Sequence, residues 1–475
     1  MAAAVKEGVK VPHFCWHPGL TVAGVCRFCM VKVEGRPKLE IACNLQATEG
    51  MQINTETAEV KEAHKWALEF HLINHPLDCP ICDQAGECGL QNYYMEVGQY
   101  HSQMTRPKVL KPKALDLGTD LVLDTERCIL CSRCVRFESE ITKTDALGIF
   151  DRGDRSIIGT YPDKKIEHNY QTNLVDICPV GAFTSKDFRF KQRVWFLEDK
   201  PSLCPGCSTG CAVDVFAKPQ TGHFYRMKPR HSAVNGHWMC DKGRHMYAHL
   251  NPEVRLRFPM MTSGSGAAKN AAFGDVVAQL SEMIKTAGPQ GVALLVSAQY
   301  TNEEYDSLFK YFVKGMGVTQ VFQWREPTEK LSDFDGILYR GDHNGNTAGL
   351  LATMKAAGIA GADKPQNQFD AALASGAKII VALAPEVPET FPSLASQLKK
   401  LGGAPFVSLW TVNNSAAKVV GMKNLIPMKG FAEKTGTFVN HSGLAQKFEA
   451  AFKGGVLESR DVIAAVDALA KTTGR

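Results

Sequence analysis

Three cysteines and one histidine fall within one short stretch of the sequence, from His75 to Cys88. Their spacing is His-x3-Cys-x2-Cys-x5-Cys, and the prolines and glycine among them give the restricted, tightly turning backbone that can wrap a compact group. Thiolates select soft metals, and four such ligands on one loop suit either a zinc ion or a cubic iron-sulfur cluster. The stretch therefore predicts a metal centre, for which the candidate ligands are His75, Cys79, Cys82 and Cys88.

Three further groups of four cysteines lie on either side of this stretch. None of them has the two Cys-x2-Cys pairs that are usual for zinc. Together the fifteen cysteines and His75 make four sets of four ligands with none left over, and no cysteine follows Cys240. The three further groups are Cys15, Cys26, Cys29 and Cys43; Cys128, Cys131, Cys134 and Cys178; and Cys204, Cys207, Cys211 and Cys240.

The spacing within each group favours a type of cluster. In the first group, a central Cys-x2-Cys pair and a late fourth cysteine match a plant-type ferredoxin loop, which predicts a two-iron cluster. The run Cys-x2-Cys-x2-Cys from Cys128 is the bacterial ferredoxin pattern, but Glu138 stands where the next cysteine is expected. The missing ligand then comes from Cys178, which precedes a proline, and completes one four-iron cluster. Zinc does not suit the spacing of the Cys128 group, but it stays open as an alternative for the first group and, more seriously, for the last.

Composition places the chain among globular proteins, with 44% hydrophobic and 22% charged residues in a length of 475 that allows several domains. No apolar run reaches the length of a membrane span, and the first residues lack the apolar segment of a signal peptide. We therefore expect a cytoplasmic protein. In a large cytoplasmic protein, clustered thiols indicate metal binding rather than a disulfide framework.

The net charge of +5 could indicate a surface for nucleic acid. Clusters held by thiolates would add negative charge, so basic residues beside the cysteines are expected to act as counter-charge. A zinc-stabilised scaffold or nucleic-acid binder is the non-enzymatic alternative, and the absence of an aromatic-plus-basic stripe argues against it. The basic residues in question are Arg127, Arg133, Arg136, Lys242 and Arg244.

Local patterns predict the elements around the first two groups. Residues Phe28 to Glu34 and Leu39 to Cys43 are expected to form a pair of strands. Apolar residues near a 3.6-residue period predict a helix from Glu56 to Asn74, which leads into the His75 loop.

From about Phe258 onward, strands and helices alternate. Expected strands are Val292 to Ser297, Gly336 to Tyr339, Lys378 to Ala384 and Ala404 to Leu409, with a helix at Asn302 to Lys314. This alternation predicts a parallel α/β sheet with helices on both faces. The glycine-bearing Gly341 to Gly349 lacks the complete Gly-x-Gly-x-x-Gly pattern of a dinucleotide site and is expected to be an ordinary loop after a strand.

The first cysteine group, followed by His-Pro-Leu-Asp-Cys-Pro-Ile-Cys-Asp-x-x-Gly-Glu-Cys-x-Leu-Gln from His75, resembles the G subunit of NADH-quinone oxidoreductase. That protein is the large iron-sulfur subunit in the peripheral arm of respiratory complex I. The resemblance implies a two-iron cluster on the first group and a four-iron cluster with His75 as its fourth ligand. The alternative is that His75 caps a helix and Asp78 completes the set. A neutral imidazole in place of a thiolate removes one negative charge and should raise the reduction potential.

The last cysteine group resembles the N-terminal cluster domain of molybdopterin oxidoreductases, in which a lysine equivalent to Lys242 lies between cluster and pterin. The string Glu433 to Asn440 resembles one near the end of that region in the family. Because no cysteine follows Cys240, we expect a shortened, degenerate domain and no molybdopterin. A serine ligand to molybdenum stays open.

The expected domain order is an α+β cluster-binding half followed by an α/β molybdopterin-oxidoreductase-like domain. A β-hairpin precedes the first helix in the family. The resemblance implies that this sequence starts within that helix, at Ala2 to Gly8, so either the start is assigned late or the hairpin is missing. The expected segments are a two-iron ferredoxin-like domain (1–70), a His/Cys four-iron segment (71–110), a four-iron ferredoxin-like domain (111–195), a molybdopterin-oxidoreductase-type four-iron domain (196–257) and the degenerate α/β domain (258–475).

The resemblance implies an electron-transfer subunit of NADH:quinone oxidoreductase that carries one 2Fe-2S and three 4Fe-4S clusters and no catalytic residue of its own. Electrons would pass from a flavin- and NADH-binding partner through the first, the Cys128 and the His75 clusters towards quinone-arm subunits, with the Cys204 cluster off this path. Such a subunit would be peripheral on the inner face of the plasma membrane, have no span of its own, and bind no nucleic acid. The alternative is an electron-transfer subunit of an NAD-linked hydrogenase or formate dehydrogenase.

Overall fold

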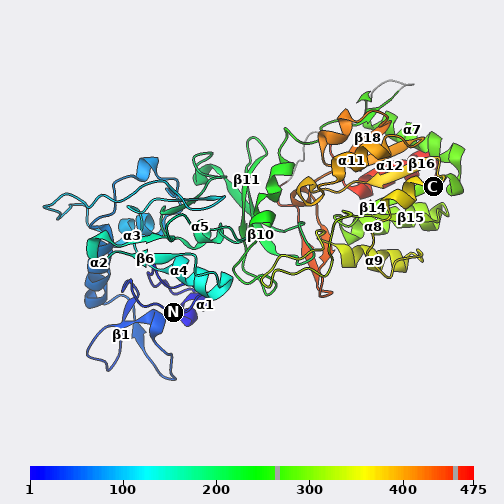
Figure 1. Cartoon of the computed structure of the whole chain (residues 1–475). Helices are drawn as coiled ribbons and strands as arrows, with labels where there is room; N and C mark the ends of the chain where they lie inside the picture. Colours follow the sequence, from blue (N-terminus) through cyan, green and yellow to red (C-terminus); the bar gives the residue numbers. More distant parts are fainter. Residues whose placement is uncertain (263–267, 453–457, 475) are drawn as a thin grey trace. The chain divides into compact units, whose positions relative to one another are not determined.

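The chain divides into two compact units in a computed structural model, Met1–Phe196 and Leu197–Arg475. The structure describes residues 1–262, 268–452 and 458–474. Figure 1 labels the main helices and strands of both units. The division lies next to the expected boundary at residue 196, and the other expected boundaries stay predictions.

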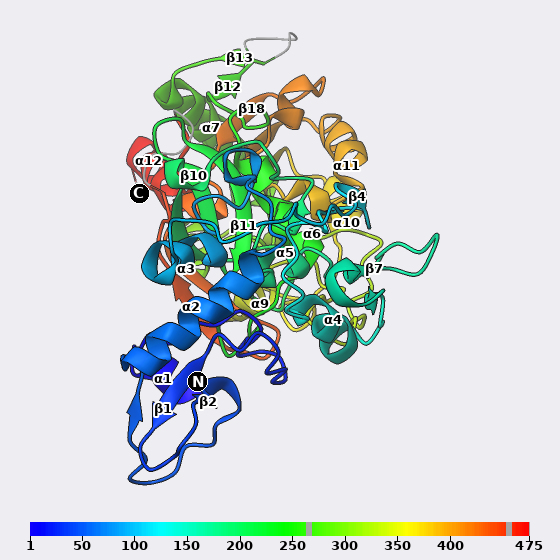
Figure 2. The same cartoon turned by 90° about the vertical axis from the view of Figure 1, so that its left-hand side faces the viewer.

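The first unit begins with a small antiparallel sheet and a helix. The helix α1 (Ala2–Lys6) precedes β1 (Met30–Val33), which pairs with both β2 (Glu40–Ile41) and β3 (Ile53–Asn54). The longer helix α2 (Ala58–Leu72) packs on β1, and His64 on this helix is 2.8 Å from the Met30 carbonyl oxygen. Figure 2 shows α2 and β1 close together. The strand pair and both helices predicted here are confirmed.

Short elements carry the remainder of the first unit. A 3-10 turn (η2, Cys79–Ile81) leads to α3 (Gly89–Val97), which packs against α2. Three short strands then form the sheet β4 (Leu115–Asp116), β5 (Leu121–Leu123) and β8 (Phe183–Ser185). The other elements are α4 (Arg133–Phe137), η3 (Glu138–Thr142), β6 (Gly148–Phe150), β7 (Ile157–Gly159) and α5 (Asn173–Ile177).

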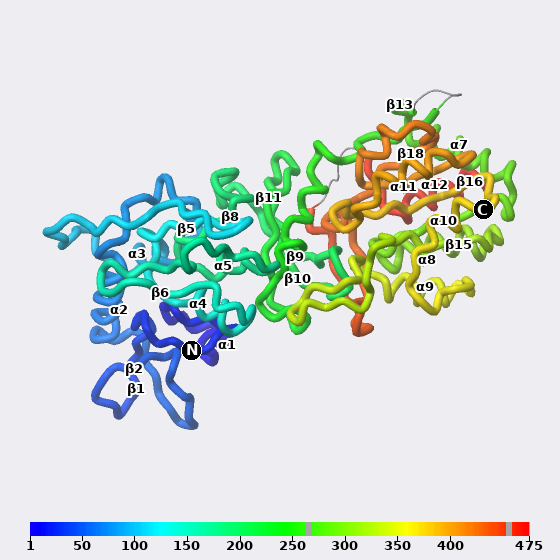
Figure 3. Tube along the Cα trace, in the orientation of Figure 1, coloured from blue at the N-terminus to red at the C-terminus, as the bar shows by residue number. Residues whose placement is uncertain are grey.

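The second unit begins with a three-stranded antiparallel sheet in the order β11-β10-β9. Its strands are β9 (Glu198–Leu203), β10 (Ala212–Lys218) and β11 (His223–Pro229), and the trace in Figure 3 shows β9 and β10 close together. After them come the one-turn helix α6 (Asp241–Arg244) and η6 (His245–Leu250).

A seven-stranded sheet in the order β13-β12-β18-β17-β16-β14-β15 forms the centre of the second unit. Its last five strands are parallel, while β12 and β13 are antiparallel at one edge. The strands are β12 (Met260–Met261), β13 (Lys269–Asn270), β14 (Val292–Ser297), β15 (Gln320–Trp324), β16 (Ile379–Leu383), β17 (Val407–Thr411) and β18 (Asn424–Pro427).

Helices cover both faces of this sheet. Successive side chains of a strand point to opposite faces, so each central strand contributes to two cores. On β14, Val292 and Leu294 join a core with α7 (Phe273–Ala287), α8 (Asn302–Phe309), α9 (Thr347–Ala356) and α12 (Val462–Thr473). Ala293 and Leu295 join a second core with α10 (Phe369–Leu373) and α11 (Leu394–Leu401). The predicted parallel α/β sheet with helices on both faces is confirmed, and the predicted strand Val292–Ser297 has the observed bounds.

One predicted strand is wrong. Residues Gly336 to Tyr339 form a turn, and only an isolated bridge between Phe334 and Arg340 remains there. The Asp335 carboxylate accepts hydrogen bonds from three successive backbone N–H groups, those of residues 337 to 339, at 3.0–3.1 Å. An aspartate that captures backbone donors in this way closes a turn in place of a strand ladder.

Candidate metal centres

The Cys128 group surrounds one small cavity in the first unit. Its sulfur-bearing residues come from two separate segments: the run that enters α4, and Cys178, which directly follows α5. Leu130 and Ser132 both have a left-handed backbone (φ of 53° and 61°), which lets the run curl around the cavity. The cavity is lined by all four members of this group, Cys128, Cys131, Cys134 and Cys178.

Burial dominates the electrostatics of this cavity. It raises the pKa of the Cys128 thiol to about 12 and that of the Cys131 thiol to about 11. The pKa values of Cys134 and Cys178 are raised for the same reason. Four protonated thiols facing one cavity can lose their protons when a cationic metal core compensates the buried charge, so this donor set fits an iron-sulfur cluster.

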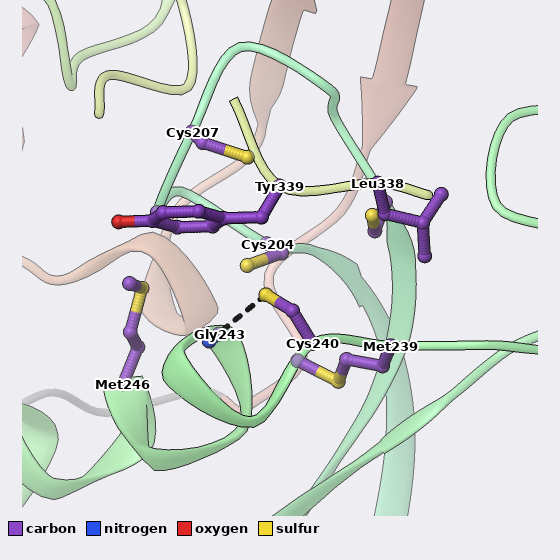
Figure 4. Close-up of a pocket in the computed structure, with 10 residues that line it drawn as sticks. Cys204, Cys207, Met239, Cys240, Gly243, Met246, Leu338 and Tyr339 are labelled. Carbon is purple, nitrogen blue, oxygen red and sulfur yellow. Dashed lines mark hydrogen bonds between the residues drawn. The ribbon is translucent and has the colours of Figure 1, made fainter. Parts of the chain in front are cut away.

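The second unit contains an equivalent cavity, lined by Cys204, Cys207, Cys211 and Cys240 (Figure 4). The backbone N–H of Cys204 donates to the Cys211 carbonyl oxygen at 2.9 Å. Cys240 caps α6, and its sulfur accepts a hydrogen bond from the Gly243 N–H at 3.3 Å. A Cβ atom on Gly243 would stand 3.1 Å from the Cys204 sulfur, so the glycine lets this helix end approach the cavity.

Tyr339 and Lys242 also belong to this second-unit site. The Tyr339 ring lines the cavity, and the Lys242 ammonium lies 4.6 Å from the centre of that ring. His343 stacks on Tyr339 with 5.2 Å between ring centres. Tyr339 comes from the turn that was expected to be a strand, and for this reason its place at the cavity could not be read from the sequence.

The first cysteine group lies around the loop that precedes β1. Cys15 donates its backbone N–H to the Cys26 sulfur at 3.5 Å. A thiol hydrogen bond from Cys26 lowers the pKa of Cys15 to about 5 and raises that of Cys26 itself. Burial, together with the neighbouring thiols of Cys29 and Cys15, raises the pKa of Cys43 to about 12. All four residues of this group are buried.

Three thiols of the His75 loop also come together. Burial, and then the nearby thiols of the group, raise the pKa values of Cys82 and Cys88, whereas Cys79 is exposed. Burial lowers the pKa of His75 to about 4, so its imidazole is neutral at pH 7. The Nδ1 atom of His75 is buried and has no hydrogen-bond partner among the described residues. A neutral ring with an unused buried nitrogen fits a metal ligand.

Asp78, the alternative ligand to His75, is engaged elsewhere. Its carboxylate forms ion pairs with Lys113 at 2.8 Å and with Arg127 at 3.1 Å. Side-chain hydrogen bonds from these two residues lower the pKa of Asp78, the lysine making the larger contribution. The Asp78 carboxylate is thus occupied by these two cationic side chains.

One peptide segment separates the His75 site from the Cys128 site. The carbonyl oxygen of Pro179, directly after Cys178, accepts a hydrogen bond from the Gly89 N–H at 3.0 Å. The Cys88 thiol lies 3.9 Å from the same oxygen. Two residues further on, Gly181 packs against the sulfur of Cys82. The segment that supplies Cys178 to one site is therefore also a wall of the other.

Two arginines of α4 join the Cys128 site to the first group. Arg136 donates to the carbonyl oxygens of Cys15 and Thr21. Arg133 donates to the carbonyl oxygens of Trp16 and Ile177, which adjoin Cys15 and Cys178 in the sequence. Of the other expected counter-charges, Arg127 pairs with Asp78 and Asp124, and Arg244 donates to the Met227 carbonyl oxygen.

Among the described residues, no group of three or more His, Cys, Asp or Glu side chains is arranged to hold a single metal ion. Within the same part of the chain, no helix combines the length and apolarity needed to cross a membrane.

Four domain families match the chain in succession. Residues 1–58 match the 2Fe-2S iron-sulfur cluster binding domain, and residues 65–103 match the NADH-ubiquinone oxidoreductase-G iron-sulfur binding region. Residues 118–184 match the ferredoxin-like domain of NADH-quinone oxidoreductase subunit 3, and residues 198–252 match the molybdopterin oxidoreductase Fe4S4 domain. The chain belongs to the family of the G subunit of NADH-quinone oxidoreductase. The predicted succession of a two-iron domain and four-iron domains is confirmed.

Three relatives show how much of the chain matches known proteins. It is 34% identical to the G subunit of the NADH-quinone oxidoreductase of Streptomyces coelicolor, over 70% of its own length and 40% of that protein. It is 36% identical to the mitochondrial NADH dehydrogenase [ubiquinone] iron-sulfur protein 1 of Solanum tuberosum, over 68% of this chain and 43% of that protein. A third relative, 33% identical over 64% of this chain and 35% of that protein, is the NADPH-Fe(3+) oxidoreductase subunit alpha of Geobacter sulfurreducens. The matches thus span about two fifths of these relatives.

Proposed function

We propose that the chain is an electron-transfer iron-sulfur subunit of an NADH:quinone oxidoreductase. In this proposal it receives electrons from an NADH- and flavin-binding partner and passes them on towards quinone, while the whole complex couples the reaction to ion translocation. The chain makes and breaks no substrate bond, and no residue is assigned a catalytic role.

The sixteen predicted ligands would hold one two-iron and three four-iron clusters. When bound, such clusters act as one-electron carriers, a role that the amino-acid side chains of this chain cannot take over. The two-iron cluster is assigned to the Cys15 group, and the four-iron clusters to the His75, Cys128 and Cys204 groups. The burial of most of the thiols and the unused Nδ1 of His75 support these assignments.

The observation that carries the proposal is the contact between neighbouring sites in the first unit. The Cys128 site adjoins the Cys15 group through Arg133 and Arg136, and it adjoins the His75 site through Pro179 and Gly181. Backbone and side chains thus join the Cys128 site to each of the other two. This arrangement supports the proposed order, in which electrons pass through the Cys128 site between the other two. The Cys204 site belongs to the other unit and is assigned no place on that route.

A second candidate is an electron-transfer subunit of another NAD(P)-linked enzyme, such as a hydrogenase or a formate dehydrogenase. The NADPH-Fe(3+) oxidoreductase relative from Geobacter keeps this class open. In either case the partners include a flavin- and nucleotide-binding subunit. Only the first candidate adds quinone-arm subunits and a position at the inner face of the plasma membrane.

Purification of the tagged full chain from gently solubilised membranes of its source organism tests the proposal. The expected result is co-purification of a flavin-binding subunit together with membrane-spanning subunits, and NADH oxidation by the purified complex with a quinone analogue as acceptor. A hydrogenase or formate dehydrogenase subunit in their place would establish the second candidate. A chain that purifies alone with zinc bound would overturn both.

A further inference from the structure

Arg133 has an unusual set of partners for an arginine in a cluster-binding run. Its two terminal nitrogens donate to backbone carbonyls that lie far apart in the sequence, to Ile177 at 3.0 Å and to Trp16. Each carbonyl is adjacent in sequence to a candidate ligand, Cys178 in one case and Cys15 in the other. One planar guanidinium therefore fastens the loop of the first site to the ligand segment of the Cys128 site.

The third nitrogen of the same side chain is left without a partner. The Nε atom of Arg133 is buried and has no hydrogen-bond partner among the described residues, although the residue as a whole is partly exposed. Arg133 also lines the cavity enclosed by the Cys128 group. A buried donor beside a cavity lined by sulfur is placed to donate to a sulfur atom of whatever fills that cavity.

The charge of Arg133 acts on both sites. Its guanidinium interacts electrostatically with the thiols of Cys131, Cys178 and Cys15, which belong to the two neighbouring sites. Within the run that enters α4, the other arginine, Arg136, donates to the first loop and to Ser132 Oγ, and it does not line the cavity. Arg133 thus differs from Arg136 in lining the cavity of the Cys128 group and in its buried Nε without a partner among the described residues.

We propose that Arg133 is a positioning residue with two effects: it fixes the spacing between the Cys15 and Cys128 cluster sites, and it raises the reduction potential at the Cys128 site. The inference rests on the proposed function only in that both sites hold iron-sulfur clusters. It assigns to one side chain a role beyond the counter-charge that the sequence predicts.

Both effects follow from the chemistry of the guanidinium. Reduction adds negative charge to a cluster, so a nearby positive charge and an N–H donor to sulfur stabilise the reduced form and raise the potential. The guanidinium is planar and presents its donors in a fixed fork, so it can hold two carbonyls and still direct Nε–H elsewhere. A lysine keeps the charge, but its single ammonium on a flexible stem cannot reproduce this arrangement.

The test compares R133M and R133K with the wild-type full chain after anaerobic reconstitution with iron and sulfide. K164M serves as the matched control, because it removes one positive charge from an exposed turn of the same unit. Potentiometric titration followed by EPR gives the midpoint potential of each cluster. Pulsed EPR gives the relaxation enhancement of the reduced two-iron centre by its reduced neighbour, which reports their separation.

In R133M the ratio of reduced to oxidised Cys128 cluster, measured at the wild-type midpoint potential, should fall about tenfold, which is about 59 mV for a one-electron couple. R133K should shift this ratio less, but should reduce the relaxation enhancement as R133M does. K164M should change neither quantity. If R133M fails to assemble the Cys128 cluster, R133K alone decides, through the relaxation enhancement.

Two results would overturn the inference while leaving the proposed function standing. If R133M binds both clusters with wild-type potentials, Arg133 does not tune the Cys128 site. If R133K retains the wild-type relaxation enhancement, Arg133 does not fix the spacing. A wild-type chain that binds no iron would instead remove the proposed function on which the inference rests.

Discussion

Gly181 packs so closely on Cys82 that a Cβ atom at position 181 would stand 2.4 Å from the Cys82 sulfur. Non-bonded carbon and sulfur atoms do not approach this closely. Either the glycine segment or the sulfur must therefore move when a methyl group is added. The glycine segment is held on both sides, since Cys178 precedes it and the Ala182 carbonyl oxygen accepts a hydrogen bond from the Asp124 N–H at 2.8 Å. The sulfur of Cys82, on a loop, is the part expected to yield.

The substitution G181A should therefore damage the His75 site while leaving its neighbours intact. We expect the iron content of the reconstituted chain to fall by about four atoms and the EPR signal of the histidine-ligated cluster to disappear. G274A is the matched control, because a Cβ atom there meets nothing within 4 Å. Full iron content in G181A, with an unchanged signal from this cluster, would show that the two sites do not share this wall.

The substitution C178S tests whether a cysteine distant in sequence completes the Cys128 site. Without the Cys178 thiol the Cys128 cluster should not assemble, so the chain should bind about four fewer iron atoms. The two-iron and His75 clusters should persist. C134S should give the same loss because both thiols face the same cavity. Different spectra from the two variants would mean that Cys178 serves another group.

Lys434 holds together a buried charge cluster in the second unit. Its ammonium lies 3.1 Å from a Glu304 oxygen and 3.2 Å from a Glu386 oxygen, and all three side chains are buried. Because K434M leaves two buried carboxylates uncompensated, we expect the free energy of unfolding of this unit to fall by about 3–5 kcal/mol. Denaturant titration followed by tryptophan fluorescence measures it.

K400M is the control for this substitution. Lys400 pairs with Asp370 at a similar distance of 3.2 Å, but both side chains are exposed. Losing an exposed pair should cost about 1 kcal/mol or less. Equal losses in K434M and K400M would contradict the role given to burial.

Glu329 should make the stability of the second unit depend on pH. Burial raises the pKa of this carboxyl to about 7, despite its ion pair with Arg325 at 2.8 Å, whereas its ordinary value is 4.5. Between these two values the folded state binds more protons than the unfolded state, so the stabilisation from Glu329 is present below pH 4.5 and is lost as pH rises through 7. The full change corresponds to about 3 kcal/mol.

The substitution E329Q should remove this part of the pH dependence. Unfolding measured at pH 5 and pH 8 should show a larger loss of stability on going to pH 8 in the wild type than in E329Q. A pH dependence that is the same in both proteins would mean that Glu329 is ionised throughout the range.

The sequence predicts most accurately those features that depend on neighbouring residues. The strand Val292–Ser297 and the helix α2 follow from local apolar patterns. Three of the four members of the Cys128 group lie close together in one short run of the sequence. The turn at Gly336 to Tyr339 could not be predicted in this way. Its apolar residues predict a strand, but their backbone N–H groups donate to the Asp335 carboxylate. Tyr339 reaches the Cys204 cavity only as a result of that turn.

The place of Arg133 illustrates a second limit. Its charge beside the cysteines is visible in the sequence and predicts a counter-charge. Its partner Trp16 lies 117 residues away, and a hydrogen bond across that separation depends on how two domains of the first unit pack. The same holds for the contact between Gly181 and Cys82, which cannot be predicted from the spacing of neighbouring residues.

The most direct test of the account is the metal content of the full chain, reconstituted without oxygen and analysed for iron, sulfide and zinc alongside EPR at stepped potentials. We predict about 14 iron atoms per chain, seen as one two-iron centre and three four-iron centres. A chain that binds zinc and no iron, with no signal on reduction, would contradict it.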